Sequence, residues 1–274
     1  MSFRVELPPT FADRLAASTR PQIGIWVCST SPLVAEICAG SGLDALLIDG
    51  EHGPNTLESV LAQLQAVAAY PITPLVRLPS ADTVLVKQLL DAGAQNLLAP
   101  MVNSADEARA MVRAMRYPPL GVRGVGSALA RSSRWSRVDD YLARAHELVS
   151  LFVQIETAEA VSNAEEIAAL EGIDGIFLGP ADLAASMGHL GQQDHPNVVS
   201  SVEHTITVAK RLGTHVGVNA FAPAMANHYL AAGADFVFVG SDVTLLARGA
   251  EALAAAYLPA DSEPDAASGP TADE

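Results

Sequence analysis

The chain has 274 residues, of which 50% are hydrophobic and only 5% are aromatic. This length is sufficient for a large core in one or two domains, and the composition predicts a core of Ala, Leu, Val and Ile. The formal net charge of −15 argues against a protein that binds nucleic acid or an acidic membrane surface, because either would need a basic face. The sequence shows neither a signal peptide nor an apolar run of membrane-spanning length, so we expect a cytoplasmic protein.

The segment PADSEPDAASGPTADE (259–274) differs in composition from the rest of the chain. It carries five acidic residues and no basic ones, and it is rich in Pro, Ala, Ser and Gly. Such a segment cannot bury enough apolar surface to order itself. We therefore predict one catalytic domain over residues 1–258, followed by a disordered acidic tail over residues 259–274.

Eight short apolar runs recur along the chain, at residues 23–27, 45–49, 73–78, 96–100, 151–156, 175–180, 215–219 and 236–240. The first seven are each followed by a segment with helical spacing, and the eighth by the apolar stretch 243–257. Continuous apolar strands are typical of burial on both faces, and a strand–helix repeat implies right-handed parallel crossovers. Eight such units predict an α/β fold of the (β/α)8 TIM-barrel type. A doubly wound open sheet is the alternative, but it typically uses fewer strands, and CSTSP (28–32) lacks its Gly-rich phosphate fingerprint.

Two of the predicted connections are long. Residues 117–150 contain a Gly- and Arg-rich loop and then a predicted helix near 137–149, and residues 181–196 form the other connection. Long loops in compact domains are usually functional or disordered. Both connections follow strands, so we expect them on the face where barrel enzymes carry out their chemistry.

Polar side chains follow the buried strands. The stretch LLIDGEHGPN (46–55) exposes three titratable groups, Asp49, Glu51 and His52, directly after a run of core residues. The polar residues at the predicted strand ends are Glu51, His52, Arg77, Gln154, Glu156, Asp182 and Asn219. Because active sites of (β/α)8 barrels lie at the carboxyl ends of the strands, we expect these groups to meet in one cavity.

Glu156 and Asp182 would be two acids facing that cavity. Unpaired carboxylates would repel each other, so a divalent cation between them is the favoured interpretation. Mg²⁺ is commonly held by one or two carboxylates, and the absence of Cys and His from the pair argues against Zn²⁺. The alternatives are a structural cluster paired with Arg, or Asp182 acting as the N-cap of a helix.

Three further features suggest binding and catalytic roles. The amides of Ala181 and Asp182, in GPAD (179–182), open a helix and could bind a substrate carboxylate. Arg77 is either an ordinary salt-bridge partner or a fixed cation that stabilises an oxyanion. His52 could act as a base if a carboxylate holds one tautomer, and Asp91 is a candidate that spacing alone does not select from the other acids.

Five segments in this order resemble the HpcH/HpaI family of metal-dependent pyruvate aldolases, most closely its 4-hydroxy-2-oxoheptanedioate aldolases of aromatic-compound catabolism. They are LLIDGEHGPN, KQLLDAGAQNLLAPMVNSADEA, RYPPLGVRGVGSALARSSRW, LFVQIET and GIFLGPADLAASMG. The resemblance covers roughly residues 10–258 and implies a class II aldolase that uses Mg²⁺, Mn²⁺ or Co²⁺ and no organic cofactor. Independently of it, the only lysines are Lys87 and Lys210, and neither lies at a predicted strand end, where an imine-forming Lys would be expected.

The resemblance also implies which residues bind the ligands. Glu156 and Asp182 match the metal ligands of the family, and Gln154 matches a residue near the metal-bound water. The amides of Ala181 and Asp182 match those that bind the carboxylate of pyruvate.

By the same resemblance, Arg77 contacts the keto oxygen of pyruvate, and His52 and Asp91 form the catalytic dyad. The implied reaction is reversible cleavage of a 4-hydroxy-2-oxo acid to pyruvate and an aldehyde such as succinic semialdehyde, through a metal-stabilised pyruvate enolate. A 2-keto-3-deoxy sugar-acid aldolase or an oxaloacetate decarboxylase would use the same site. From another class, a non-catalytic barrel that binds small acids is a distant alternative.

Family members are typically homohexamers, built as trimers of dimers that exchange the last barrel helix. Segment 241–257 would be that helix here. In the Gly-rich loop, Arg123 or Arg131 could contact a distal carboxylate of the substrate, although surface or interface positions are equally compatible. Asn219 could tune the preference for the aldehyde.

Overall fold

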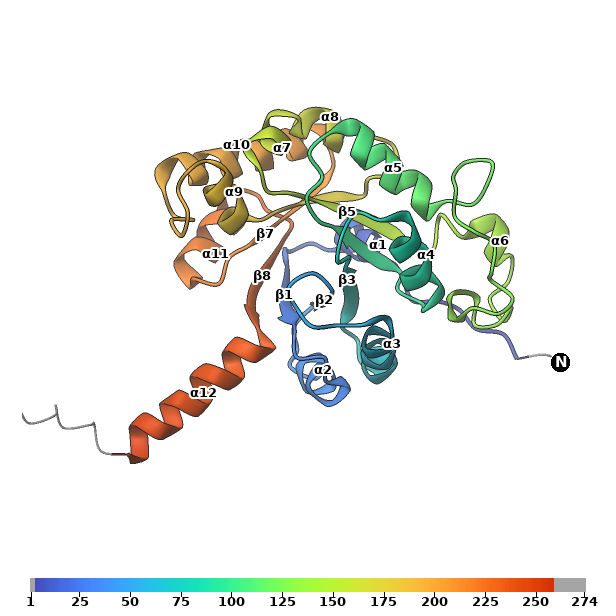
Figure 1. The fold of residues 1–274 in the computed structure, drawn as a ribbon, viewed down its shortest axis with the longest axis horizontal. Coiled ribbons are helices and arrows are strands. Elements are labelled where there is room, and N and C mark those ends of the chain that lie inside the picture. The colour runs from blue at the N-terminus through green and yellow to red at the C-terminus, as the bar shows by residue number, and fades with distance from the viewer. Residues whose placement is uncertain (1–2, 259–274) are drawn as a thin grey trace, which may run out of the picture.

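Every strand of the structure begins at, or one residue before, an apolar run of the sequence. The computed structural model describes residues 3–258, and its strands are β1 (Gln22–Val27), β2 (Ala45–Asp49), β3 (Thr73–Arg77), β4 (Asn96–Ala99), β5 (Ser150–Ile155), β6 (Gly175–Leu178), β7 (His215–Asn219) and β8 (Phe236–Ser241). Each strand pairs in parallel with its neighbours in chain order, and β8 pairs with β1, which closes the barrel (Figure 1). The predicted (β/α)8 fold is therefore confirmed.

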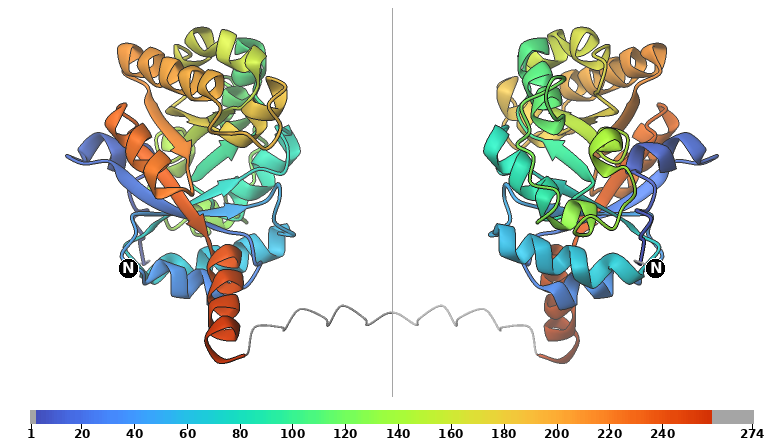
Figure 2. Two further views of the ribbon diagram at one scale, coloured as in Figure 1. Left: turned by 90° about the vertical axis from the view of Figure 1, so that its left-hand side faces the viewer. Right: turned by 90° about the vertical axis from the view of Figure 1, so that its right-hand side faces the viewer.

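Helices surround the sheet on its outer side (Figure 2). They are α1 (Phe11–Ala17), α2 (Pro32–Ala39), α3 (Leu57–Ala66), α4 (Thr83–Asp91), α5 (Ala105–Met115), α6 (Tyr141–Arg144), α7 (Ala158–Ser162), α8 (Ala164–Ala168), α9 (Pro180–Ser186), α10 (Pro196–Leu212), α11 (Pro223–Ala231) and α12 (Asp242–Tyr257), with 3-10 turns η1 (Val67–Ala69) and η2 (Arg131–Ser133). Helix α1 precedes the barrel and closes its amino-terminal end, because Phe11 is fully buried against Phe152 and Phe236.

The helix predicted near 137–149 is wrong. The segment contains only the single turn of α6, and it is preceded by residues with left-handed backbone, Arg134, Trp135, Ser136 and Asp140. Left-handed residues interrupt a right-handed helix, so the apolar positions here anchor a loop instead. Val138 and Tyr141 form a small buried cluster beneath it.

The prediction of a core built from Ala, Leu, Val and Ile holds for most of the space between strands and helices, although Tyr229 is buried there as well. Inside the barrel, five phenylalanines pack together with Trp26; they are Phe11, Phe152, Phe177, Phe236 and Phe238. Glycines on neighbouring strands make room for the rings, since a Cβ on Gly24, Gly175 or Gly217 would overlap an aromatic carbon. The few aromatic residues of this chain are thus concentrated where a large side chain can fill a narrow interior.

Alternation along each strand sets the position of the polar residues. On β2, Ala45 and Leu47 face the barrel interior, whereas Leu46 and Ile48 face the helices. Because side chains alternate between the two faces, Asp49 continues the inward set. Phe152 on β5 likewise predicts that Gln154 and Glu156 point inward above the aromatic layer. The carboxyl ends of the strands therefore present a polar layer on an apolar base.

Helix α12 leaves the barrel and projects away from it (Figures 1 and 2). Every residue from Val243 to Leu258 is exposed in the single chain, including Leu245, Leu246 and Leu253. The predicted acidic tail, residues 259–274, lies outside the described residues. Within residues 3–258, the structure contains no helix with the length and hydropathy needed to cross a bilayer.

Candidate active site

A buried ion pair joins β2 and β3 at the carboxyl end of the barrel. Asp49 and Arg77 are register neighbours, and both point inward. Arg77 Nε donates to Asp49 Oδ1 at 2.9 Å, and Arg77 Nη2 donates to Asp49 Oδ2 at 2.8 Å. Burial would raise the pKa of Asp49, but the hydrogen bonds and charge of Arg77 outweigh burial and lower it. Asp49 is therefore held as a carboxylate, and its charge fixes the guanidinium.

Two further groups hold Arg77. Arg77 Nη1 lies 2.9 Å from Glu51 Oε2, and Arg77 Cζ lies 4.4 Å from the centroid of the Trp26 ring. Trp26 Nε1 in turn donates to Asn219 Oδ1 at 2.9 Å, which ties β1 to β7. A guanidinium has five N–H groups. Two of these groups donate to Asp49, and Arg77 Nη1 forms an ion pair with Glu51 without a hydrogen bond, so N–H groups remain available to a ligand.

Glu156 lies on the opposite side of the mouth, directly after β5, and is 2% exposed. Its Oε1 accepts from Met101 N at 2.7 Å, and its Oε2 accepts from Gln154 Nε2. Burial raises the pKa of Glu156 to about 7, and the negative charges of Asp182 and Glu51 add to this effect. The pKa of Glu156 therefore lies close to neutral pH when no cation is bound.

Asp182 lies in the first turn of α9, exposed on the same side. The N-cap of α9 is Gly179, so Asp182 is not the cap, and one of the predicted alternatives is excluded. Within residues 3–258, no Lys or Arg makes an ion pair with Glu156 or Asp182, so an Arg-paired cluster is not formed either. The amides of Ala181 and Asp182 belong to the first helical turn, where an intrahelical acceptor is lacking.

The donor atoms on this side fit an oxygen-preferring divalent cation. Glu156, Asp182 and Glu51 place negative charge around one volume, and the buried Gln154 Oε1 has no hydrogen-bond partner. In the described part of the chain, no group of three or more His, Cys, Asp or Glu residues is arranged to enclose a metal. Two carboxylates with the remaining positions open to water and ligand is the arrangement typical of Mg²⁺ rather than Zn²⁺.

These groups surround a cavity of about 280 Å³. Five of its lining residues are sequence-predicted site residues, namely His52, Arg77, Gln154, Ala181 and Asp182. Asn219 also lines the cavity, and Glu156 lies immediately behind it, since a Cβ on Gly179 would be 2.9 Å from Glu156 Oε2. Side chains from β1, β2, β3, β5, β6 and β7 therefore converge on one volume.

Asp91 lies elsewhere, at the end of α4. Its Oδ1 accepts from Arg123 Nη2 at 3.2 Å, and among residues 3–258 no hydrogen bond joins it to His52. The predicted contact between His52 and Asp91 is therefore not made within one chain. Arg123 is fully buried beside Tyr117 and Tyr141, so it does not line the cavity as a carboxylate receptor. Arg131 lines a different cavity, described below.

Sequence reasoning misjudged two groups. Asp49 was placed among the exposed titratable residues, but it is only 2% exposed and serves Arg77. The function of Trp26 beneath Arg77 was missed. The signal for both was present, because Trp26, Asp49 and Arg77 occupy inward-facing positions on three neighbouring strands.

The chain is similar to known proteins over most of its length. A model of the HpcH/HpaI aldolase/citrate lyase family matches residues 22–249. A hydroxypyruvate/pyruvate aldolase from Deinococcus radiodurans is 53% identical over 251 residues, covering 92% of this chain and 90% of that protein. A 4-hydroxy-2-oxo-heptane-1,7-dioate aldolase from Salmonella dublin is 55% identical over 247 residues, covering 90% and 94%. The crystal structure of an HpcH/HpaI aldolase/citrate lyase family protein from Burkholderia cenocepacia has a TM-score of 0.85 and 39% identity, covering 89% of this chain and 97% of that one.

The raised pKa of Glu156 predicts that the metal-free protein loses stability as the pH rises. Between its ordinary value of 4.5 and the folded value of about 7, folded Glu156 keeps a proton that the unfolded chain has released. We expect the free energy of unfolding to fall by up to about 3 kcal/mol across this window, at about 1.4 kcal/mol per pH unit. Urea denaturation in the presence of a chelator, from pH 4 to 8, measures this slope. Glu156→Gln should flatten it, whereas Glu159→Gln on the exposed face of α7 should not. If the slope persists in Glu156→Gln, another group is responsible.

Proposed function

Since the chain belongs to the HpcH/HpaI aldolase/citrate lyase family, we propose that it is a class II aldolase that reversibly cleaves 4-hydroxy-2-oxo acids to pyruvate and an aldehyde. It is a carbon–carbon lyase. The observation that carries the proposal is the division of charge in the cavity: a fixed guanidinium on β3 faces two unneutralised carboxylates after β5 and β6. A 2-oxo acid bound between them would meet a positive charge on each side once a cation is present.

Glu156 and Asp182 would hold the divalent cation, which we propose to be Mg²⁺, Mn²⁺ or Co²⁺. When bound, such a cation supplies Lewis-acid polarisation of the 2-oxo group. The chain's own residues do the rest. Arg77 cannot swing away from the cavity because Asp49 and Trp26 hold it, and its charge needs no reorganisation when negative charge develops on the substrate oxygen.

The amides of Ala181 and Asp182 would bind the carboxylate of pyruvate, since they lack intrahelical partners and carry the positive end of the α9 dipole. Gln154, whose Nε2 is engaged by Glu156, would present its free Oε1 to the cavity. These contacts orient the donor half of the substrate. They leave the side of the cavity that contains His52 and Asn219 for the aldehyde half.

His52 lines the cavity and is exposed. We propose that it is the base that accepts the proton of the 4-hydroxyl group in the cleavage direction. Asp91 is bound to Arg123 in the single chain, so it could serve His52 only across a boundary between two copies. We propose this arrangement for the dyad. Arg123 would then hold Asp91 in the orientation that the neighbouring site requires.

The proposed assembly is a homohexamer, a trimer of dimers that exchange α12. Helix α12 exposes an apolar surface that a stable single chain would bury, with Leu246 71% exposed. Leu33 and Ile37 on α2 are also exposed and would provide part of the receiving surface on another copy. Exchange of a terminal helix buries both surfaces without rebuilding the barrel.

The reaction is tested with metal-free protein, pyruvate and a panel of aldehydes that includes succinic semialdehyde and glyceraldehyde, with Mg²⁺, Mn²⁺ and Co²⁺ added back separately. We expect aldol product only with metal, and a loss of about a thousandfold or more in kcat/KM for Glu156→Gln and for Asp182→Asn. Glu159→Gln is the matched control and should retain wild-type turnover. Product formation without metal, or full activity in Glu156→Gln, would refute the proposal. A strong preference for glyceraldehyde would indicate a sugar-acid aldolase instead.

Assembly through α12 is tested by Leu246→Arg. A charge placed in the proposed interface should reduce the molar mass measured by sedimentation, because an unpaired buried charge is costly. Thr207→Arg makes the same change in charge on the exposed face of α10 and should leave the mass unchanged. If Leu246→Arg sediments as the wild type does, α12 does not mediate assembly.

The shared dyad predicts complementation between two inactive variants. His52→Ala and Asp91→Asn should each be slow when expressed alone. When the two are co-expressed, random mixing gives about one site in four an intact His52 and an intact Asp91 from different chains, so about a quarter of wild-type activity should return. Activity no higher than that of the separate variants would show that the two residues do not cooperate between copies.

A further inference from the structure

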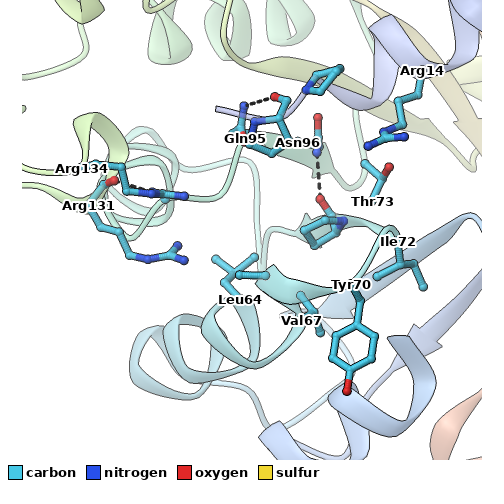
Figure 3. Close-up of a pocket in the computed structure, with 15 residues that line it drawn as sticks. Arg14, Leu64, Val67, Tyr70, Ile72, Thr73, Gln95, Asn96, Arg131 and Arg134 are labelled. Carbon is cyan, nitrogen blue, oxygen red and sulfur yellow. Dashed lines mark hydrogen bonds between the residues drawn. The ribbon is translucent and has the colours of Figure 1, made fainter. Parts of the chain in front are cut away.

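A second cavity lies at the amino-terminal end of the barrel, remote from the candidate active site. Its volume is about 140 Å³, and Figure 3 shows the residues that line it. Thr73, which lines it, begins the strand that Arg77 ends, so the two sites are separated by about 13 Å along β3. Leu64, Val67 and Ile72 give the cavity an apolar wall. The proposed reaction does not use this cavity.

Three arginines line this cavity, and none of them makes an ion pair with an acidic residue within residues 3–258. Of the fourteen arginines in the chain, nine make ion pairs in the structure. The five that make none within residues 3–258 are Arg14, Arg113, Arg131, Arg134 and Arg137, and three of these, Arg14, Arg131 and Arg134, face this one volume. In a chain with a net charge of −15, such a concentration of uncompensated positive charge indicates a site for an anion.

The loop holds Arg131 and Arg134 close together. Arg131 Nη1 donates to Ala92 O at 3.1 Å, and Arg134 adopts a left-handed backbone with φ of 51°. The buried Ser133 hydroxyl accepts from Ser136 N at 2.8 Å and so fixes the turn between them. Burial and the charge of Arg134 lower the pKa of Arg131 to about 10. The two like charges therefore repel each other in the free protein, and a bound anion would relieve that repulsion.

Thr73 provides an independent sign of a ligand. It is only 4% exposed, and among the described residues its hydroxyl has no hydrogen-bond partner. A buried hydroxyl without a partner costs about 1–3 kcal/mol. Figure 3 shows Thr73 beside Arg14, on the side of the cavity opposite Arg131 and Arg134. Anion-binding groups are thus present at both ends of an apolar wall.

We propose that this cavity binds a small α,ω-dicarboxylate as a ligand separate from the substrate. One carboxylate is held by Arg131 and Arg134, the other by Arg14 and Thr73, and the aliphatic chain lies along Leu64, Val67 and Ile72. Planar guanidinium groups suit carboxylates because they donate two parallel hydrogen bonds. A compact anion such as inorganic phosphate could engage only one end. This inference does not depend on the proposed reaction.

The test is calorimetric titration of the metal-loaded full chain with succinate, glutarate and adipate. Saturating pyruvate is included so that the candidate active site is already filled. We expect one molecule to bind per chain, with one chain length preferred. Arg131→Gln/Arg134→Gln should weaken binding at least tenfold, and Thr73→Val should weaken it a few fold. Arg109→Gln/Arg113→Gln removes the same charge from the exposed face of α5 and should change nothing.

A second measurement guards against misfolded variants. Without ligand, the double variant should unfold in a single cooperative transition, as the wild type does, which shows that it is folded. The best dicarboxylate should raise the unfolding temperature of the wild type but not that of the double variant. The proposal fails if no dicarboxylate binds, if the double variant binds as tightly as the wild type, or if inorganic phosphate binds as tightly as the best dicarboxylate.

Discussion

The candidate active site depends on the buried ion pair between Asp49 and Arg77. The barrel interior beneath it is filled with aromatic rings, and a charge placed above such a layer must be paired to persist. Two hydrogen bonds to one carboxylate and a stacked indole hold the guanidinium in place. Removal of one partner from a buried pair typically costs about 3–5 kcal/mol, because the remaining charge is left uncompensated. The same pair therefore supports both the fold of β2 and β3 and the positive charge at the mouth of the barrel.

The two halves of that mouth are electrostatically different. On the side of β2 and β3, a cationic group stands at the cavity, because Arg77 is held there by ion pairs with Asp49 and Glu51. On the side of β5 and β6, Glu156 and Asp182 have no cationic partner within the described residues, and burial raises the pKa of Glu156. A site in which both halves were neutralised would attract neither a cation nor an anionic substrate. The uneven pairing leaves carboxylates free to hold a cation on one side of the cavity and keeps a fixed guanidinium on the other side.

Much of the fold could be predicted from the sequence because one rule governs all eight strands. Each strand is a short, largely buried apolar run, and several strands present a polar inward position at or near their carboxyl end, as β3 does with Arg77 and β7 with Asn219. The burial of Asp49 could not be predicted in this way. An acidic residue at a strand end gives the same sequence pattern whether it faces solvent or an arginine on the next strand. The prediction of a helix near 137–149 was wrong because it rested on apolar spacing. That spacing does not reveal residues with left-handed backbone, such as Asp140. The contact between His52 and Asp91 rested on resemblance, and the structure of one chain does not contain it.

Two features of the single chain have no explanation within one chain. Helix α12 exposes an apolar face to solvent, and Asp91 is held by the fully buried Arg123 and does not line the cavity of its own barrel. A buried arginine is expensive unless it is paired, so its presence behind Asp91 argues that the position of this carboxylate matters. Association of copies would explain both features, because it would cover the helix and bring a second chain to the mouth of the first barrel. The exposed face of α12 and the position of Asp91 are therefore the two features of the single chain on which the proposed assembly rests.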